Sequence, residues 1–310
     1  MSLTKKRTLL TIGAAAFLFL SLVMTALRMV AIYTAVDPAT GFYSADILWY
    51  DVLLTVFAAF GILFFGFSYL FGVRFCTKTE TKERNLTPMD SQMRPTCGTR
   101  LMYATDSTPR IFASAFCGFS LITFALLSFI ELALTPMEIA LQVLAILAGI
   151  YLLLQYTPLF PLYSARRTLG ALLPVIWSGA TLVQYFLTSN RIATGEYHNW
   201  YILSLVTITV FFFLQSLFTT PARVLYRFHT LYAVGILGAG LTLIFTVPTL
   251  LLSSFWCYSA YMQYTNFYAL MGLIACAVYM TIFLFGFLHD LGKVKNQNGL
   301  YDICEDETSL

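Results

Sequence analysis

The chain alternates between long apolar segments and shorter polar connections. Eight segments are close to or above the roughly 20 residues that a helix needs to cross a bilayer. They cover residues 8–33, 47–72, 111–134, 137–160, 168–187, 201–219, 229–254 and 267–289. Because these segments do not alternate between apolar and polar positions, they predict helices and not the strands of a membrane barrel. The predicted fold class is an all-α integral membrane protein, a bundle of eight transmembrane helices.

Basic residues fall on alternate connections between these segments. Sixteen of the eighteen Lys and Arg residues lie at the N-terminus, after segments two, four and six, or after segment eight. Since Lys and Arg concentrate on the cytoplasmic side of membrane proteins, both termini are predicted to be cytoplasmic (N-in/C-in). The expected location is integral to the cytoplasmic (plasma) membrane.

Composition and chain organisation agree with this class. Hydrophobic residues make up 59% and charged residues 11% of the chain, whereas soluble domains carry roughly 25% charged residues. The eight-span domain is predicted to cover residues 1–291, including a cytoplasmic linker at 73–110 that is too short for a core of its own. A disordered cytoplasmic tail is predicted at 292–310, and segment 8–33 is expected to stay as an uncleaved anchor.

The six cysteines do not indicate a redox or metal site. Only Cys257 falls on the predicted outer side, so no disulfide is expected within the outer surface. The chain contains no C-x-x-C pair, which argues against a zinc or thioredoxin-like site.

Charged side chains near the bilayer core are costly and usually have a partner or a task. Four of them, from four segments, are predicted at similar depth on the outer side: Arg28, Asp51, Glu131 and Glu138. Arg28 shares one helix face with Ser21 and Thr25. Three interpretations remain open for Arg28. It forms a structural pair with Glu131 or Asp51, it extends outward to the headgroups, or it belongs to a ligand or ion site.

Aromatic residues also gather at the predicted outer side. They include Trp49, Tyr50, Trp200 and Trp256. They form either an interfacial aromatic belt or, together with carboxylates, a cap for an organic cation. The candidate ligand-binding site therefore consists of these four aromatic residues and the four charged ones.

Other polar and small residues inside the segments predict helix packing. Gln155 and Gln215 are expected to form hydrogen bonds between packed helices, with a water-filled pathway as the alternative. Pro174 and Pro248 should kink their helices. Close helix packing is predicted at three glycines of the seventh segment: Gly235, Gly238 and Gly240.

Enzymatic and cofactor motifs are missing from the sequence. It contains no H-E-x-x-H, Walker A, dinucleotide-binding or G-x-S-x-G pattern. The sequence therefore leans against an enzyme, with an intramembrane enzyme as the least favoured interpretation, and no cofactor or metal is expected. The expected partners are the lipid bilayer, a small-molecule solute, and either a membrane protein partner or further copies of the chain. Nucleic acid is not expected. Two functions remain: solute transport or ligand binding through an outward-facing polar vestibule, or a non-catalytic membrane subunit or scaffold.

Overall fold

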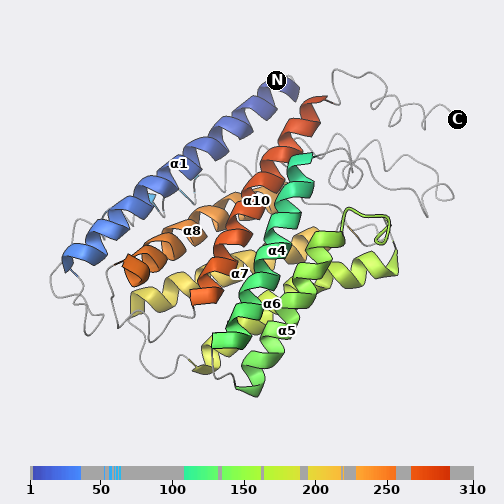
Figure 1. The fold of residues 1–310 in the computed structure, drawn as a ribbon. Helices are drawn as coiled ribbons and strands as arrows, with labels where there is room; N and C mark the ends of the chain where they lie inside the picture. Colours follow the sequence, from blue (N-terminus) through green and yellow to red (C-terminus); the bar gives the residue numbers. More distant parts are fainter. Residues whose placement is uncertain are drawn as a thin grey trace, which may run out of the picture.

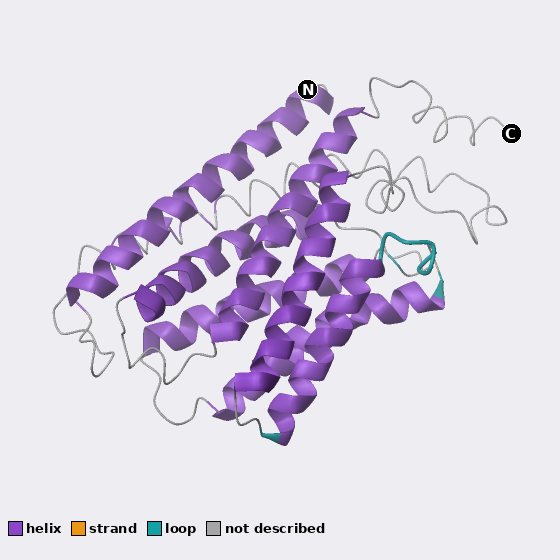
Figure 2. Cartoon of the chain, viewed as in Figure 1, coloured by secondary structure: helices purple, strands orange, loops and turns teal. Residues whose placement is uncertain are grey.

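The described part of the chain is helical throughout, apart from a few turn residues (Figures 1 and 2). The computed structural model describes residues 3–35, 108–131, 135–161, 164–188, 195–217, 219, 228–255 and 267–293, together with residues 52, 56, 57, 59, 61 and 63. Within these residues there is no strand. The helices with described bounds are α1 (Leu3–Ala35), α4 (Thr108–Glu131), α5 (Pro136–Leu154), α6 (Ala165–Thr188), α7 (Gly195–Leu217), α8 (Phe228–Phe255) and α10 (Phe267–Lys293).

All seven of these helices are long and apolar enough to cross a membrane. They match seven of the eight predicted segments, so the all-helical, multi-pass membrane character is confirmed. Segment 47–72 lies largely outside the described residues, but Phe57 and Gly61 are helical and pack between α1 and α8. Figure 1 places the start of α1 and the end of α10 at the same end of the bundle. The count of eight spans and the cytoplasmic orientation of both termini stay predictions.

The helices α8 and α10 form the centre of the bundle. Their apolar stretches are the most buried of the seven: 67% of the stretch in α8 and 61% of that in α10 lie inside the protein. α10 packs against α4 and α8, and α8 also packs against α1 and α7. The remaining helices complete a ring in which α7 contacts α6, α6 contacts α5, and α5 contacts α4. α1 and α6 therefore lie at the periphery, and α10 stands between α1 and α4.

Glycines allow the closest helix contacts. A Cβ on Gly118 of α4 would lie 2.5 Å from the carbonyl oxygen of Gly149 on α5, so only glycine fits there. The predicted close packing of α8 is confirmed. A Cβ on Gly235 would meet Leu284 of α10 at 2.5 Å, and one on Gly238 would meet Thr207 of α7 at 3.0 Å. Small residues at helix interfaces are the usual means by which membrane helices approach each other.

The boundaries of α5 differ from the prediction for a local reason. The apolar segment runs to residue 160, yet α5 ends at Leu154 with a cap at Gln155. Pro158 and Pro161 follow, and proline disfavours helical backbone in the residue before it. At the other end, Thr135 and Glu138 form a capping box, which is a stronger local signal than apolarity alone.

The packing of α4 against α10 can be tested through two buried thiols. The sulfur atoms of Cys117 and Cys276 lie 4.0 Å apart, so a side-chain rotation should bring them to disulfide distance. We expect iodine, which dissolves in the bilayer, to oxidise both thiols to one disulfide in the otherwise native chain, with release of two iodides and two protons. Mass spectrometry of unreduced peptides would detect the link. Cys117→Ser is the control, and the absence of a link in the native chain would contradict the packing.

Candidate functional site

The residues that share a face with Arg28 are buried together on α1. Arg28 and Ser21 are 0% exposed and Thr25 is 5% exposed. The Ser21 hydroxyl donates to the carbonyl of Phe17, and the Thr25 hydroxyl donates to the carbonyl of Ser21. Both hydroxyls are therefore satisfied within their own helix. This leaves the guanidinium of Arg28 as the polar group on this face that reaches another helix.

Arg28 binds the backbone of α8 where proline interrupts its hydrogen bonding. Its Nη1 donates to the carbonyl oxygens of Ile244 at 3.0 Å and Phe245 at 3.1 Å. Residue 248, four positions after Ile244, is a proline and has no N–H to offer that carbonyl. Arg28 supplies the donor in its place. The Phe245 carbonyl also accepts from the Thr249 hydroxyl at 2.7 Å.

Two aromatic faces enclose the same guanidinium. Its central carbon lies 5.8 Å from the ring centroid of Trp200 on α7 and 5.5 Å from that of Phe245 on α8. Further rings extend the cluster toward α6, because Tyr201 packs on Phe245 at 5.5 Å and on Tyr185 at 4.3 Å. A cation over an aromatic ring gains about 2 kcal/mol or more where water is excluded. The rings and the carbonyls together stabilise a charge that the apolar surroundings disfavour.

The structure brings together two of the eight predicted site residues, Arg28 and Trp200. Glu138 lies elsewhere: its carboxylate accepts from the backbone N–H of Thr135 at 2.7 Å and from the Thr135 hydroxyl at 2.8 Å. It thus serves the start of α5, a helix that packs on α4 and α6. Four predicted residues lie outside the described part: Trp49, Tyr50, Asp51 and Trp256. The backbone of Glu131 is described, but its side chain is not. The predicted pairing of Arg28 with Glu131 or Asp51 stays a prediction.

The guanidinium of Arg28 points into the protein and not outward to the headgroups. The side chain is 0% exposed, and its acceptors lie on the central helix α8. Backbone carbonyls as partners were not anticipated from the sequence. The signal that could have revealed them is Pro248, which marks the one carbonyl of its turn that needs an external donor.

A second buried polar group lies between α4, α5, α7 and α10. The amide nitrogens of Gln155 and Gln215 both donate to the hydroxyl of Tyr279, at 3.3 and 2.6 Å. Gln155 also donates to the hydroxyl of Ser114, and all four side chains are buried. We name these four residues the tyrosine–glutamine cluster. The expected hydrogen bonding of Gln155 and Gln215 between helices is confirmed, whereas Ser114 and Tyr279 carry no pattern that singles them out in sequence.

Two basic residues counted with the cytoplasmic connections are in fact buried at helix starts. Arg110 is 0% exposed, and its aliphatic part covers Gly286 of α10, where a Cβ would lie 2.8 Å from its Cγ. Arg167 is 3% exposed and donates to the carbonyl of Phe160 at 2.8 Å. Among the described residues there is no group of three or more His, Cys, Asp or Glu that could hold a metal ion. The chemistry on offer in this part of the chain is hydrogen bonding and cation binding by rings and carbonyls.

Comparison with protein-family models, with curated proteins and with solved structures gives no match for this chain.

The role of Arg28 as donor to the α8 break can be tested with a double-mutant cycle. Arg28→Ala should lower the free energy of unfolding by about 1.5–3 kcal/mol, since it removes charged hydrogen bonds to buried carbonyls. Pro248→Ala returns an N–H to the Ile244 carbonyl. In the Arg28→Ala background it should therefore recover about 1 kcal/mol, the size of a typical hydrogen bond in a membrane protein. Reversible unfolding in mixed micelles would measure all four proteins.

Pro174→Ala on α6 is the matched control, because it removes the other proline inside a helix without touching Arg28 or its acceptors. Its effect should add to that of Arg28→Ala, as expected for separate sites. If Pro248→Ala were equally additive with Arg28→Ala, Arg28 would not be the donor for that carbonyl.

Proposed function

We propose that this multi-pass membrane protein binds or transports a small solute, with its site around Arg28 and Trp200 where α1, α7 and α8 meet. One observation carries the proposal: a full positive charge, inside an apolar helix, bound to a helix that proline interrupts. Ionisable residues inside membrane segments commonly mark solute or ion pathways. Interrupted helices with exposed carbonyls build the sites of many transporters.

The position along α1 supports a site on the outer side. The apolar stretch of α1 ends at Thr34. At 1.5 Å per residue, Arg28 lies about 9 Å from that end along the helix. The charge pattern predicts that this end of α1 faces outside. A solute arriving from that side would meet Trp200, Phe245 and Arg28 within a few ångströms of one another.

The break in α8 supplies a means of opening. Arg28 of α1 binds the turn of α8 that comes just before Pro248, through the carbonyls of Ile244 and Phe245. Exchange of these bonds for bonds to a solute would release this turn from α1 and let α8 bend at the proline. The structure then corresponds to a closed state, in which the guanidinium is shielded from solvent.

The competing function is a non-catalytic membrane subunit or scaffold. The observation that favours it is the same full burial of Arg28. Full burial is expected for a permanent structural contact between α1 and α8 as well as for the closed state of a transport site. In that case the site would never admit water, and the activity would come from a partner protein. Accessibility of the site from outside distinguishes the two.

Cysteine labelling in intact cells tests the proposal. In a cysteine-free chain, Thr25→Cys and Thr249→Cys place single thiols on the two helices beside Arg28, at positions that are 5% and 0% exposed in this state. A membrane-impermeant thiol reagent should modify both from outside if the site opens. Val30→Cys, on the exposed apolar surface of α1, is the lipid-facing control and should stay unmodified. Failure to label either buried position would favour the scaffold.

A further inference from the structure

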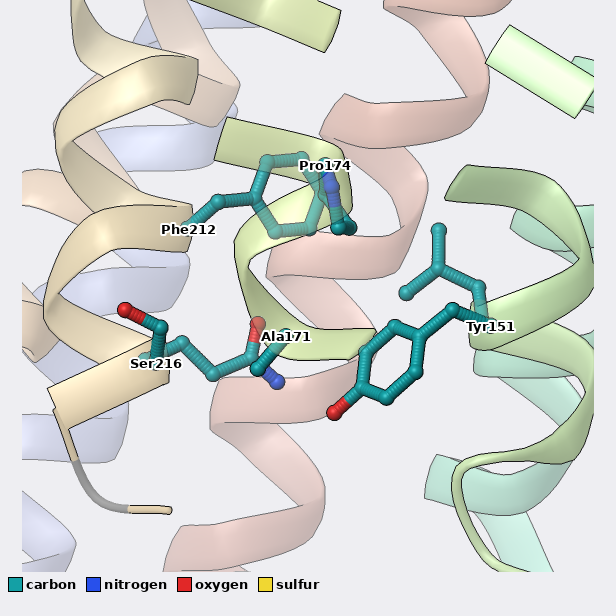
Figure 3. Close-up of a pocket in the computed structure, with 7 residues that line it drawn as sticks. Tyr151, Ala171, Pro174, Phe212 and Ser216 are labelled. Carbon is teal, nitrogen blue, oxygen red and sulfur yellow. The ribbon is translucent and has the colours of Figure 1, made fainter. Parts of the chain in front are cut away.

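A small cavity lies between α5, α6 and α7, lined by residues that include Tyr151, Ala171, Pro174, Gln215 and Ser216 (Figure 3). The space that the centre of a water molecule can occupy in this cavity is about 10 Å³. A buried water needs roughly 10–15 Å³ of such space. The cavity is therefore the size of one water molecule and too small for an organic solute. It is a different place from the Arg28 site, which involves α1 and α8.

Tyr151 presents an unsatisfied hydroxyl to this cavity. The side chain is 4% exposed, and its hydroxyl makes no hydrogen bond of ordinary geometry among the described residues, with the Arg167 guanidinium as a charged neighbour. Figure 3 shows the ring reaching from α5 toward α6, with the hydroxyl at its far end. Gly170 makes this position available, because a Cβ there would overlap the Tyr151 ring. A buried hydroxyl without a partner costs about 1–3 kcal/mol, so an occupant that accepts or donates a hydrogen bond is favoured.

The wall formed by α6 offers a second polar group. Pro174 lies inside the helix and has no N–H, so the carbonyl of Gly170, four residues earlier, lacks its helical donor. That carbonyl belongs to the same turn as Ala171 and Pro174, which line the cavity. The nearby hydroxyl of Ser178 donates to the carbonyls of Pro174 and Val175 and not to that of Gly170.

The wall formed by α7 adds amide and hydroxyl groups. Gln215 donates to Tyr279 at 2.6 Å while its side chain also borders the cavity. The Ser216 hydroxyl donates to the carbonyl of Phe213 at 2.7 Å and keeps its capacity to accept. A water molecule needs two to four polar partners, and the three walls provide that number.

We infer that this cavity is a binding site for a single water molecule, which links the Tyr151 hydroxyl on α5 to the proline break of α6 and to Gln215 on α7. The water extends the tyrosine–glutamine cluster to α6. A metal cation is a poor occupant, since the Arg167 guanidinium lies close enough to Tyr151 for its charge to act on that side chain. An empty cavity is disfavoured by the unpaired hydroxyl.

Radiolytic footprinting of the full chain in lipid nanodiscs tests the site directly. X-rays split bound water into hydroxyl radicals that add oxygen to the nearest side chain, even where bulk solvent is excluded. Tyr151 should gain one oxygen at a rate at least several-fold above that of Tyr232. Tyr232 is a suitable reference, because it is 1% exposed and its hydroxyl is already bound to the Leu10 carbonyl at 2.7 Å. Equal rates for the two tyrosines would overturn the inference.

A pair of substitutions gives an independent readout. If water is bound, Tyr151→Phe should raise the unfolding equilibrium constant about fivefold, the effect of losing an ordinary hydrogen bond. Ala171→Val, which fills the cavity with methyl groups, should raise that constant in the native chain and lower it in the Tyr151→Phe background. A dry cavity predicts instead that both single changes leave the constant unchanged or lower it. An effect of Tyr151→Phe that appears with sodium chloride but not with choline chloride would identify a cation and also overturn the inference.

Discussion

Every backbone carbonyl inside a membrane must find a donor within the protein, because lipid provides none. Prolines inside helices break this condition at one carbonyl each, and the helices that the structure describes contain two such prolines, at 174 and 248. At Pro248 the missing donor comes from Arg28, on a helix more than two hundred residues away in sequence. This contact joins α1 to α8 and places the guanidinium over the rings of Trp200 and Phe245.

The same contact explains how a charge is tolerated in an apolar bundle. Burial of an isolated guanidinium would cost far more than a single hydrogen bond returns. Two carbonyl dipoles and two aromatic faces distribute that cost over α7 and α8. Close packing also positions α8 itself, because Gly235 and Gly238 let this helix approach α10 and α7. Small residues in the centre therefore position the polar groups at the end of the bundle.

Much of the fold could be predicted from the sequence, because long apolar segments have one stable form in lipid. Arg28 could be identified as exceptional for the same reason. Its acceptors could not, since every residue carries a carbonyl and only the combination of Pro248 with a facing donor makes one of them special. Glu138 carries a local signal as well. Its place three residues after Thr135 is a capping signal, and its carboxylate accepts from the backbone N–H of Thr135.

The two helix turns that proline interrupts differ in how strongly they are hydrogen-bonded to neighbouring helices. A guanidinium on α1 joins the break in α8 to another helix by direct, charge-assisted bonds, which are roughly twice as strong as neutral ones. The break in α6 borders a cavity next to the unsatisfied Tyr151 hydroxyl, and an occupant the size of water would join it to its neighbours only through neutral bonds. A bridging water is nearly as good a partner as a direct hydrogen bond, yet it is covalently attached to neither helix. On this argument α6, which is also peripheral, is the helix whose bend changes first, while motion of α8 requires Arg28 to find other acceptors.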